Sequence, residues 1–371
     1  MDALMLPLNW QRVRLGDIAE INPPTIIPNV FYYIDLENVE KGQLLNKQLM
    51  TKNKAPSRAR RLLSKNDILY QLVRPYQRNN YFFTLNGNYV ASTGYAQIRT
   101  LQNPSFLYFA LHSNYFVNAV LDRCEGTSYP AISSNELKKC EVILPPPNEQ
   151  SAIANILSDL DRYLCALDAL ILKKEGVKKS LSFELLSQRK RLKGFNQAWQ
   201  RVRLGDIANY LTSNLSVEQI TQQGEIKVYD VNNFIGYTDT TFISDKPYIS
   251  IVKDGSVGRV RILPPKTNIL STMGALIANH RTTTEFLFYL LSNFDFKNFT
   301  SGSIIPHIYF KDYKEKTIFL PPLNEQSAIA NILSALDNEI ASLKNKKRQF
   351  ENIKKALNHD LMSAKIRVLE K

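Results

Sequence analysis

The sequence contains little cysteine, little glycine and no long run of apolar residues. Its 371 residues include three cysteines, Cys124, Cys140 and Cys165, without CxxC spacing, which excludes a disulfide framework and indicates a reducing compartment. The 14 glycines and 17 prolines are too few for collagen-like or low-complexity chains. No stretch approaches 18 uninterrupted apolar residues, and the first ten residues do not resemble a secretory signal. We therefore expect a globular cytoplasmic protein with no membrane contact.

Sequence signatures of catalysis are also missing. There is no GxxxxGK[ST] phosphate loop and no GxGxxG dinucleotide motif, and the four histidines form no metal-binding spacing. Adenine methyltransferases use Asn-Pro-Pro followed by Tyr or Phe, whose ring stacks on a flipped base. Residues 22–25 read NPPT instead, and no glycine-rich cofactor loop precedes them. We interpret this segment as a proline turn and expect any chemistry to belong to a partner.

The charge is basic and unevenly distributed. Lys and Arg number 47 against 34 Asp and Glu, a net charge of +13. Residues 173–193 and 344–371 each carry +6 and together hold nearly all of this excess. A basic protein neutralises phosphates and so favours nucleic-acid binding. Two solvated helix faces would give the same pattern, so charge alone leaves both interpretations open.

Two long internal repeats predict the architecture. Residues 10–19 and 199–208 both read WQRVRLGDIA. Residues 144–161 read LPPPNEQSAIANILSDLD, and residues 320–337 differ from them at two of 18 positions. The offset between the first pair of segments is larger than that between the second pair, so the interior of the second half is the shorter one. The halves therefore share a beginning and an end, which predicts one fold occurring twice in a pseudo-two-fold molecule.

The segments between these repeats diverge, which suggests that two modules of one fold read different things. Apolar and β-branched runs at 68–73 and 81–84 indicate strands, and helical spacing predicts a core helix over 106–118. We expect a mixed α/β domain in each half. Some positions still correspond: at the offset of the second repeat pair, Gly126, Pro130 and Ile132 match Gly302, Pro306 and Ile308.

An apolar heptad pattern follows each proline turn. It predicts two helices of ~40 residues, roughly 60 Å long at 1.5 Å per residue, that pack on each other or on partner helices. We expect Gly176 and the lysines within the seams, Lys174, Lys178, Lys347 and Lys354, to weaken pairing there. The seam residues are Ile153, Leu157, Leu160, Leu164, Leu167 and Ile171 in the first half, and Ile329, Leu333, Leu336, Ile340, Leu343 and Phe350 in the second.

These features together resemble the specificity (S) subunit of type I restriction-modification systems. The resemblance covers essentially the whole chain and rests on the double occurrence of WQRVRLGDIA, a Gly-x-x-x-Pro-x-Ile segment and LPP-x-NEQ-x-AI before a long helix. It implies two pseudo-symmetric target-recognition domains, at 1–148 and 194–322. Two long antiparallel coiled-coil helices, at 149–193 and 323–371, would separate them.

The resemblance also implies a function. Each domain would read one half of a split sequence in double-stranded DNA, while the helices set the unread gap and dock two methyltransferase (M) subunits. Those partners would transfer methyl groups from S-adenosylmethionine to adenine. Restriction/translocase (R) subunits, using ATP and magnesium, would add DNA cleavage. The S subunit itself would be non-catalytic, with no cofactor and no metal site of its own, which agrees with the missing signatures.

Candidate DNA-binding residues come from physical reasoning, because recognition domains of this family differ with their targets. Residues 52–78 carry eight Lys or Arg against a single acidic residue, which suits a surface that follows phosphates. Within it, residues 74–80 form a polar loop whose Arg suits guanine and whose Gln and Asn suit adenine. Mutation of Arg74 or Arg78 is expected to weaken binding or relax one half-site. The candidates here are Lys54, Arg58, Arg60, Arg61, Arg74, Tyr76, Gln77, Arg78 and Asn79.

The second half offers a comparable segment at 253–261, and each half has a glycine segment whose backbone amides can approach a phosphate. A solvated surface and ordinary turns are the alternative interpretations of these segments. The remaining candidates are Thr127, Ser128 and Tyr129 in the first half, and Lys253, Ser256, Arg259, Arg261, Ser301 and Ser303 in the second.

Three other functions remain open at this point. The chain can be the specificity subunit of a fused restriction-methylation enzyme with one partner polypeptide. It can be a coiled-coil interaction scaffold without sequence-specific DNA binding, which a weak salt dependence of DNA binding would indicate. It can also be an independent methyltransferase, which failure of the purified chain to bind S-adenosylmethionine would exclude.

Overall fold

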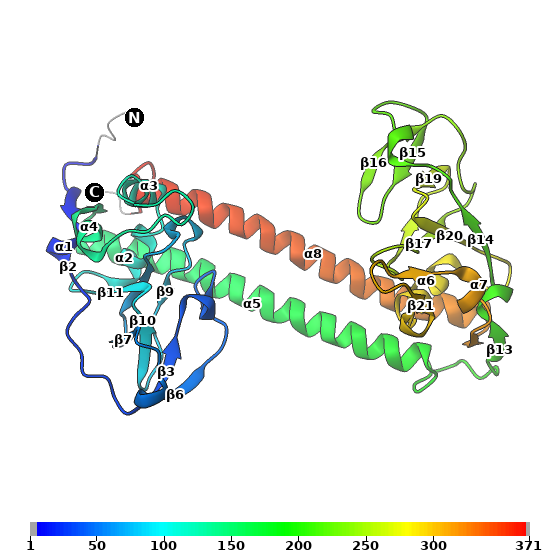
Figure 1. Ribbon diagram of the computed structural model, residues 1–371, viewed down its shortest axis with the longest axis horizontal. Helices are drawn as coiled ribbons and strands as arrows, with labels where there is room; N and C mark the ends of the chain where they lie inside the picture. Colours follow the sequence, from blue (N-terminus) through cyan, green and yellow to red (C-terminus); the bar gives the residue numbers. More distant parts are fainter. Residues whose placement is uncertain (1–5, 369–371) are drawn as a thin grey trace. The chain divides into compact units, whose positions relative to one another are not determined.

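The computed structural model describes residues 6–368 and divides into two compact units (Figure 1). Unit 1 comprises the residues up to Asp168 together with those from Lys346 onward, and unit 2 comprises Ala169–Asn345. The longest helices, α5 (Pro147–Leu186) and α8 (Leu323–Met362), each contribute one part to each unit. Unit 1 is therefore built from two chain segments that are far apart in sequence.

Unit 1 contains a mixed α/β domain. Its helices besides α5 and α8 are α1 (Leu15–Ile18), α2 (Pro104–Ala110), α3 (Asn114–Leu121) and α4 (Ser134–Lys139). Its strands are β1 (Gln11–Arg14), β2 (Ala19–Ile21), β3 (Val30–Ile34), β4 (Val39–Glu40), β5 (Gln43–Leu44), β6 (Gln48–Thr51), β7 (Ala59–Leu62), β8 (Ile68–Gln71), β9 (Tyr81–Phe82), β10 (Tyr89–Ser92), β11 (Tyr95–Thr100) and β12 (Glu141–Leu144). One sheet has the order β2–β11–β8–β9, and a second has the order β6–β3–β10–β7 with β3 and β10 parallel.

Unit 2 repeats this plan. Its shorter helices are α6 (Thr284–Ser292) and α7 (Phe310–Tyr313). Its strands are β13 (Gln200–Arg203), β14 (Ala208–Thr212), β15 (Ile226–Tyr229), β16 (Phe234–Thr238), β17 (Tyr248–Val252), β18 (Val260–Leu263), β19 (Thr267–Ile269), β20 (Met273–Ala278), β21 (Thr300–Ser301), β22 (His307–Ile308) and β23 (Thr317–Leu320). The sheet β14–β20–β17–β18 corresponds to β2–β11–β8–β9, and β16–β15–β19 again contains a parallel pair. Within the described part of unit 2, no strand takes the place of β7. The predicted mixed α/β class with two repeated domains is confirmed.

The two repeated sequence segments are joined in space within each unit. Strand β1 of the WQRVR segment pairs antiparallel with β12, which precedes the prolines, and β13 pairs with β23 in the same way. The indole Nε1 of Trp10 donates to Glu149 at 3.0 Å, and that of Trp199 donates to Glu325 at 3.0 Å. All four side chains are buried. The identical segments are therefore the two sides of one structural joint.

The core helix predicted over 106–118 is two helices, α2 and α3. The break comes at His112, and Ser113 caps α3 by accepting a hydrogen bond from the Phe116 amide at 3.2 Å. A serine that can cap a new helix competes with continuation of the previous one. Both helices still pack in the core, where Phe116 meets the ring of Tyr70 edge-on.

Helices α5 and α8 run antiparallel and lie side by side in both units. In unit 1, Asp161 and Asp168 of α5 face Lys354 and Lys347 of α8, so residue numbers rise along one helix as they fall along the other. Within residues 6–368 no helix is long and apolar enough to cross a membrane.

The predicted seam residues are buried to different degrees. Ile153, Leu157, Leu167, Ile171, Ile329, Leu333 and Ile340 are buried, whereas Leu160, Leu164, Leu336, Leu343 and Phe350 are half-buried.

The expectation that the seam lysines weaken pairing is wrong. In unit 2, Lys174 pairs with Glu339 at 2.8 Å, and Lys178 pairs with Asp337. In unit 1, Lys347 pairs with Asp168 at 2.5 Å, and Lys354 pairs with Asp161. Each lysine keeps its stem along the seam and directs its ammonium to a carboxylate of the other helix. These half-buried pairs contribute modest energy individually, but their charge pattern favours one register. Helix α5 also continues through Gly176.

Candidate nucleic-acid interface

The loop between β8 and β9, residues 72–80, is the most structured of the predicted DNA-binding segments; we name it hairpin loop 1. Residues Pro75–Gln77 form a 3-10 turn between two residues in the left-handed region, Arg74 at φ 53° and Arg78 at φ 56°. Residues with side chains seldom adopt this conformation, so surrounding contacts must hold it. Tyr76 and Gln77 at the tip are exposed.

A buried amide holds hairpin loop 1 from beneath. Gln71, which is 4% exposed, accepts a hydrogen bond from the Asn79 amide at 3.1 Å and donates to Gln77 Oε1 at 2.9 Å. Its own backbone amide donates to Asn80 Oδ1 at 2.8 Å. These hydrogen bonds hold Gln77, Asn79 and Asn80 in place before any ligand binds, and the side chain of Gln77 stays at the surface. The loop is therefore preorganised.

Arg78 points inward. Its Nη1 donates to the His112 carbonyl oxygen at 2.9 Å and its Nη2 donates to Asn114 Oδ1 at 2.8 Å. Burial lowers the pKa of the Arg78 guanidinium. The side chain thus connects hairpin loop 1 to the start of α3 and does not extend from the loop tip.

A second segment lies against hairpin loop 1, and we name it glycine loop 1 (residues 125–131). The Arg74 amide donates to the Pro130 carbonyl at 2.7 Å, and the Ile132 amide donates to the Leu72 carbonyl at 3.0 Å. The Arg74 guanidinium lies 4.1 Å from the ring centre of Tyr129, which is 65% exposed. Thr127 and Ser128 are also exposed. The structure thus brings together two segments that the sequence predicted separately.

Unit 2 contains the same connection between hairpin loop 2 (residues 253–259, between β17 and β18) and glycine loop 2 (residues 301–307). The Gly255 amide donates to the Pro306 carbonyl at 2.8 Å, and the Ile308 amide donates to the Lys253 carbonyl at 2.9 Å. Gly255, at φ +82°, takes the left-handed position that Arg74 occupies in unit 1. The backbone scaffold is shared, whereas the side chains on it differ.

The surface of the two loops in unit 2 carries short polar, cationic and apolar groups. Ser256, Arg259, Ser301 and Ser303 are exposed, and Ile304 at the tip of glycine loop 2 is 92% exposed. Hairpin loop 2 and glycine loop 2 are further joined by a hydrogen bond from His307 Nδ1 to Asp254 Oδ1 at 2.6 Å.

Two predicted cations of unit 2 face the protein. Arg261 on β18 donates to the Asn232 carbonyl at 2.9 Å and lies 5.2 Å from the ring centre of Tyr229. Lys253 is half-buried at the base of hairpin loop 2. Arg261 therefore binds β15 and the turn that follows it, Lys253 lies at the base of the loop, and neither is at the loop tip.

The other predicted basic segment lies on the second sheet of unit 1. Lys54 and Arg60 are exposed, and Arg58 forms an ion pair with Asp35 at 2.8 Å. Arg61 is half-buried and burial lowers its pKa. These residues belong to or precede β7, so the +7 segment 52–78 is distributed over two sheets.

Several supporting residues were missed by sequence reasoning. Gln71 and Asn80 lie on either side of hairpin loop 1 and are almost fully buried, at 4% and 1% exposed. His112 and Asn114, which hold Arg78, come from the break between α2 and α3. Polar residues beside an apolar run were the available signal for the first pair; the second pair has no local signal, since it contacts the loop only after folding.

The Asn22 segment is structural. The Asn22 amide group donates to Ser134 Oγ at 2.8 Å and accepts from the Gln97 amide at 3.0 Å. Its side chain is therefore held by α4 and β11, and residues 23–28 have no regular secondary structure. Among residues 6–368 no cluster of His, Cys, Asp or Glu is arranged to hold a metal ion.

Comparison with known families shows to which family the chain belongs. The sequence profile described as "Type I restriction modification DNA specificity domain" matches residues 7–174 and again residues 196–352. The chain belongs to this family. One match falls on each of the repeated halves, and membership confirms the prediction of a DNA specificity subunit in place of an enzyme.

Curated relatives match over most or nearly all of the chain. The type I restriction enzyme MjaVIII specificity subunit of Methanocaldococcus jannaschii is 23% identical, over 99% of this chain and 95% of that protein. The putative MjaX specificity subunit of the same organism is 29% identical, over 64% of this chain and 62% of that protein.

Solved structures share the fold. The crystal structure of a type I restriction-modification S subunit from M. genitalium superposes with a TM-score of 0.64 at 20% identity, over 96% of this chain and 98% of that chain. A chain from a structure described as the basis of complex assembly and conformational transition of the type I R-M system gives a TM-score of 0.62 at 21% identity, over 96% and 98%.

Proposed function

We propose that each unit presents one DNA-reading surface, made of its hairpin loop and glycine loop, and that the two surfaces read the two halves of a split target in double-stranded DNA. The observation that carries this proposal is the shared connection: Arg74 to Pro130 in unit 1 and Gly255 to Pro306 in unit 2. One backbone scaffold with different exposed side chains suits two modules of one fold that recognise different bases.

In unit 1 the candidate residues divide into readers and supports. Gln77 offers an amide suited to adenine, and Arg74 on the Tyr129 ring offers a guanidinium suited to guanine. Tyr76, Thr127 and Ser128 complete the exposed surface. Asn79 accepts a hydrogen bond from the Lys41 amide at 3.2 Å, and with Arg78 it supports the loop.

In unit 2 the corresponding readers are Ser256 and Arg259 of hairpin loop 2, with Ser301 and Ser303 of glycine loop 2. Arg259 suits a guanine edge, and the hydroxyl groups suit base edges or phosphates. Lys253 lies at the base of the loop, and Arg261 joins β18 to the turn after β15. The different readers of the two units would give the two half-sites different sequences.

The β7 segment of unit 1 adds a sequence-independent contact. Lys54, Arg58 and Arg60 are exposed, and cations of this kind bind phosphates without reading bases. Arg61 is half-buried and would support the strand.

The long helices would fix the gap and bind the partners. We assign 1–148 and 194–322 to DNA recognition, and 149–193 and 323–371 to spacing and docking. Support comes from exposed residues that are identical in the two helices: Ser151 and Asn155 recur as Ser327 and Asn331. The fold does not require identity at exposed positions, whereas two copies of one partner would.

Those partners would be two methyltransferase subunits that use S-adenosylmethionine, together with restriction/translocase subunits that use ATP and magnesium. The chain would then act in the cytoplasm, where the DNA is.

Co-expression with the adjacent methyltransferase gene in a methylation-free host tests this function. Long-read mapping of methylated adenines is expected to show a split motif with a constant gap. A swap of residues 253–259 and 301–307 for those of a relative should change one half-site only. If the partner is expressed and bound but no adenine is methylated, the chain is an interaction scaffold and the proposal is wrong.

A further inference from the structure

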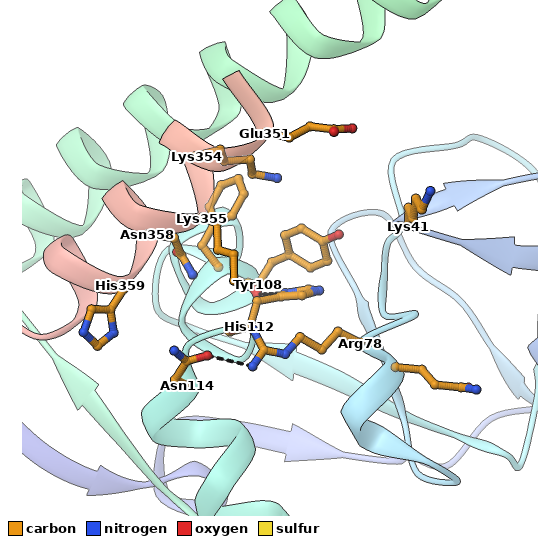
Figure 2. A pocket seen from close by; sticks show the side chains of 12 residues that line it. Lys41, Arg78, Tyr108, His112, Asn114, Glu351, Lys354, Lys355, Asn358 and His359 are labelled. Atoms are coloured by element: carbon orange, nitrogen blue, oxygen red, sulfur yellow. Dashed lines mark hydrogen bonds between the residues drawn. The ribbon is translucent and has the colours of Figure 1, made fainter. Parts of the chain in front are cut away.

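A cavity of about 290 Å³ lies in unit 1 between hairpin loop 1, the α2–α3 corner and the last turns of α8 (Figure 2). Gln77 and Arg78 of the loop line one side, and Tyr108, Phe109 and His112 line another. The remaining lining residues are Lys41, Asn114, Glu351, Lys354, Lys355, Asn358 and His359.

The cavity carries more positive charge than its neighbours neutralise. Lys354 pairs with Asp161, and the lining carboxylate Glu351 lies 3.6 Å from Lys347. Within residues 6–368 no carboxylate forms an ion pair with the three remaining cations, Lys41, Arg78 and Lys355.

Arg78 shows the imbalance most clearly. Its guanidinium is half-buried, and its two hydrogen-bond acceptors, the His112 carbonyl and the Asn114 amide oxygen, are both neutral. Figure 2 shows Arg78 and Asn114 joined beneath the end of α8. A partly buried cation with neutral acceptors gains when an anion approaches it.

Two neutral side chains complete the cavity wall. His112 donates from Nδ1 to the Tyr108 carbonyl at 2.7 Å and accepts at Nε2 from Asn80 at 3.3 Å, so its ring is fixed in the wall and offers no donor to a ligand. Burial lowers the pKa of His112 to about 4. Asn358 has a buried side-chain oxygen without a hydrogen-bond partner. Asn358 lines the cavity, and the NH₂ group of its amide can donate to an anionic oxygen.

The corresponding place in unit 2 has different chemistry. At the offset of the second repeat pair, helix α5 carries Lys179, Ser182 and Phe183 where α8 carries Lys355, Asn358 and His359. The cavity there is lined mainly by apolar groups, with one lysine and one aspartate: Ser182, Phe183, Leu186, Ser187, Leu290, Asn293, Phe294, Asp295, Asn298, Phe299, Lys316 and Ile318. The cationic cavity is therefore a property of unit 1 and not of the repeated fold.

We propose that the cavity of unit 1 binds a phosphoryl group, namely a backbone phosphate of the DNA beside the half-site that hairpin loop 1 reads. Gln77 belongs both to the reading surface and to the cavity wall, so a phosphate held by Arg78 and Lys355 lies at the edge of that surface. This proposal rests on the proposed function and adds a phosphate site to it. The contact is sequence-independent and would position unit 1 on the duplex.

The test is the salt dependence of DNA binding by the full chain assembled with its methyltransferase partner. Lys355→Ala removes an exposed cation without an ion-pair partner, and Lys179→Ala is the matched control at the repeat-related position of α5. Log K falls as log [salt] rises, and the loss of one phosphate contact makes this negative slope less steep by about 0.9. Between 50 and 200 mM salt, the advantage of wild type over Lys355→Ala should therefore shrink about 3.5-fold. This should occur on target and non-target duplexes alike, with no change for Lys179→Ala.

A second measurement separates DNA from a free ligand. Broadening of the ³¹P signal of inorganic phosphate by wild-type protein, abolished by Lys355→Ala without any change in DNA binding, would support a phosphoryl site but overturn the backbone assignment. Equal slopes for both variants, with no phosphate effect, would overturn the site altogether. If wild type itself shows no preference for a split target, the proposed function has failed, which is a different result.

Discussion

Arg367 and Glu149 form a bidentate ion pair, with Nε to Oε1 at 2.8 Å and Nη2 to Oε2 at 2.9 Å. Glu149 is 2% exposed. In unit 2, Arg191 binds Glu325 in the same way, at 3.0 and 2.8 Å. Each arginine follows the end of one long helix and binds the first turn of the other. The pairs therefore fasten the ends of the antiparallel helices to the strand joints where Trp10 and Trp199 donate to the same carboxylates.

Trp10→Phe is expected to loosen unit 1 selectively. The substitution removes the indole hydrogen bond to a buried carboxylate, and hydrogen bonds to charged groups contribute about 1.5–3 kcal/mol to stability. Hydrogen exchange should show faster opening of β1 and β12 while unit 2 is unchanged. Trp199→Phe provides the matched variant and should loosen β13 and β23. An identical response of both units to either variant would contradict this assignment.

Arg74→Ala and Arg259→Ala are expected to relax opposite half-sites. A side chain that reads a base discriminates against the wrong one by about 1–3 kcal/mol, roughly 5- to 150-fold. Competition binding with duplexes altered in one half-site at a time measures this discrimination. Weaker binding to every duplex, with the preference in both half-sites unchanged, would show that the arginine acts only on phosphates.

Gly302→Ala is expected to abolish preference for the second half-site. Gly302 has φ +91°, and a Cβ there would lie 2.2 Å from the Ile305 carbonyl oxygen, so glycine loop 2 must change shape. Gly194→Ala is the control: φ is +94°, and its Cβ meets nothing within 4 Å. Both carry the ~1–2 kcal/mol cost of a left-handed residue with a side chain. Methylation mapping should therefore show loss of preference for the second half-site in Gly302→Ala but not in Gly194→Ala. An equal loss of this preference in both variants would indicate general destabilisation.

The stability of unit 1 is expected to fall as the pH drops from about 6.5 toward 4. Burial lowers the pKa of His112 to about 4, whereas the unfolded chain binds a proton near 6.5. Below 6.5 the unfolded state therefore holds more protons, and stability falls with pH by about 1–3 kcal/mol over this window. Denaturant unfolding of unit 1 at pH 7 and pH 4.5 measures the difference. His112→Gln should flatten it, whereas His280→Gln, at an exposed histidine, should leave it unchanged.

The helices show how far local pattern predicts structure. Heptad spacing predicted α5 and α8, because the apolar residues of a buried helix face must recur every three or four positions. The same pattern wrongly predicted that Lys178 and Lys354 weaken the pairing of the helices, because their partners Asp337 and Asp161 lie on the other helix. The single helix over 106–118 was wrong for a related reason. Spacing continued through His112, while a capping hydrogen bond from Phe116 to Ser113 began a new helix.

The sequence predicted less of the candidate site than of the long helices. Composition selected hairpin loop 1 and glycine loop 1 separately, but the hydrogen bond between Arg74 and Pro130 joins residues far apart in sequence. Composition also could not predict the direction in which each side chain points. Arg74 faces the exposed ring of Tyr129, whereas Arg78, further along the same loop, turns into the protein.

The sequence by itself determined the two repeated domains, the two long helices and the family, because repeats and heptads are written in consecutive residues and need no knowledge of distant contacts. Only the tertiary structure decided which cations face solvent, which loops meet and which carboxylates join the ends of the helices. Those relationships arise when β8 and β17 are placed in their sheets, and packing alone brings Pro130 to Arg74 and Pro306 to Gly255.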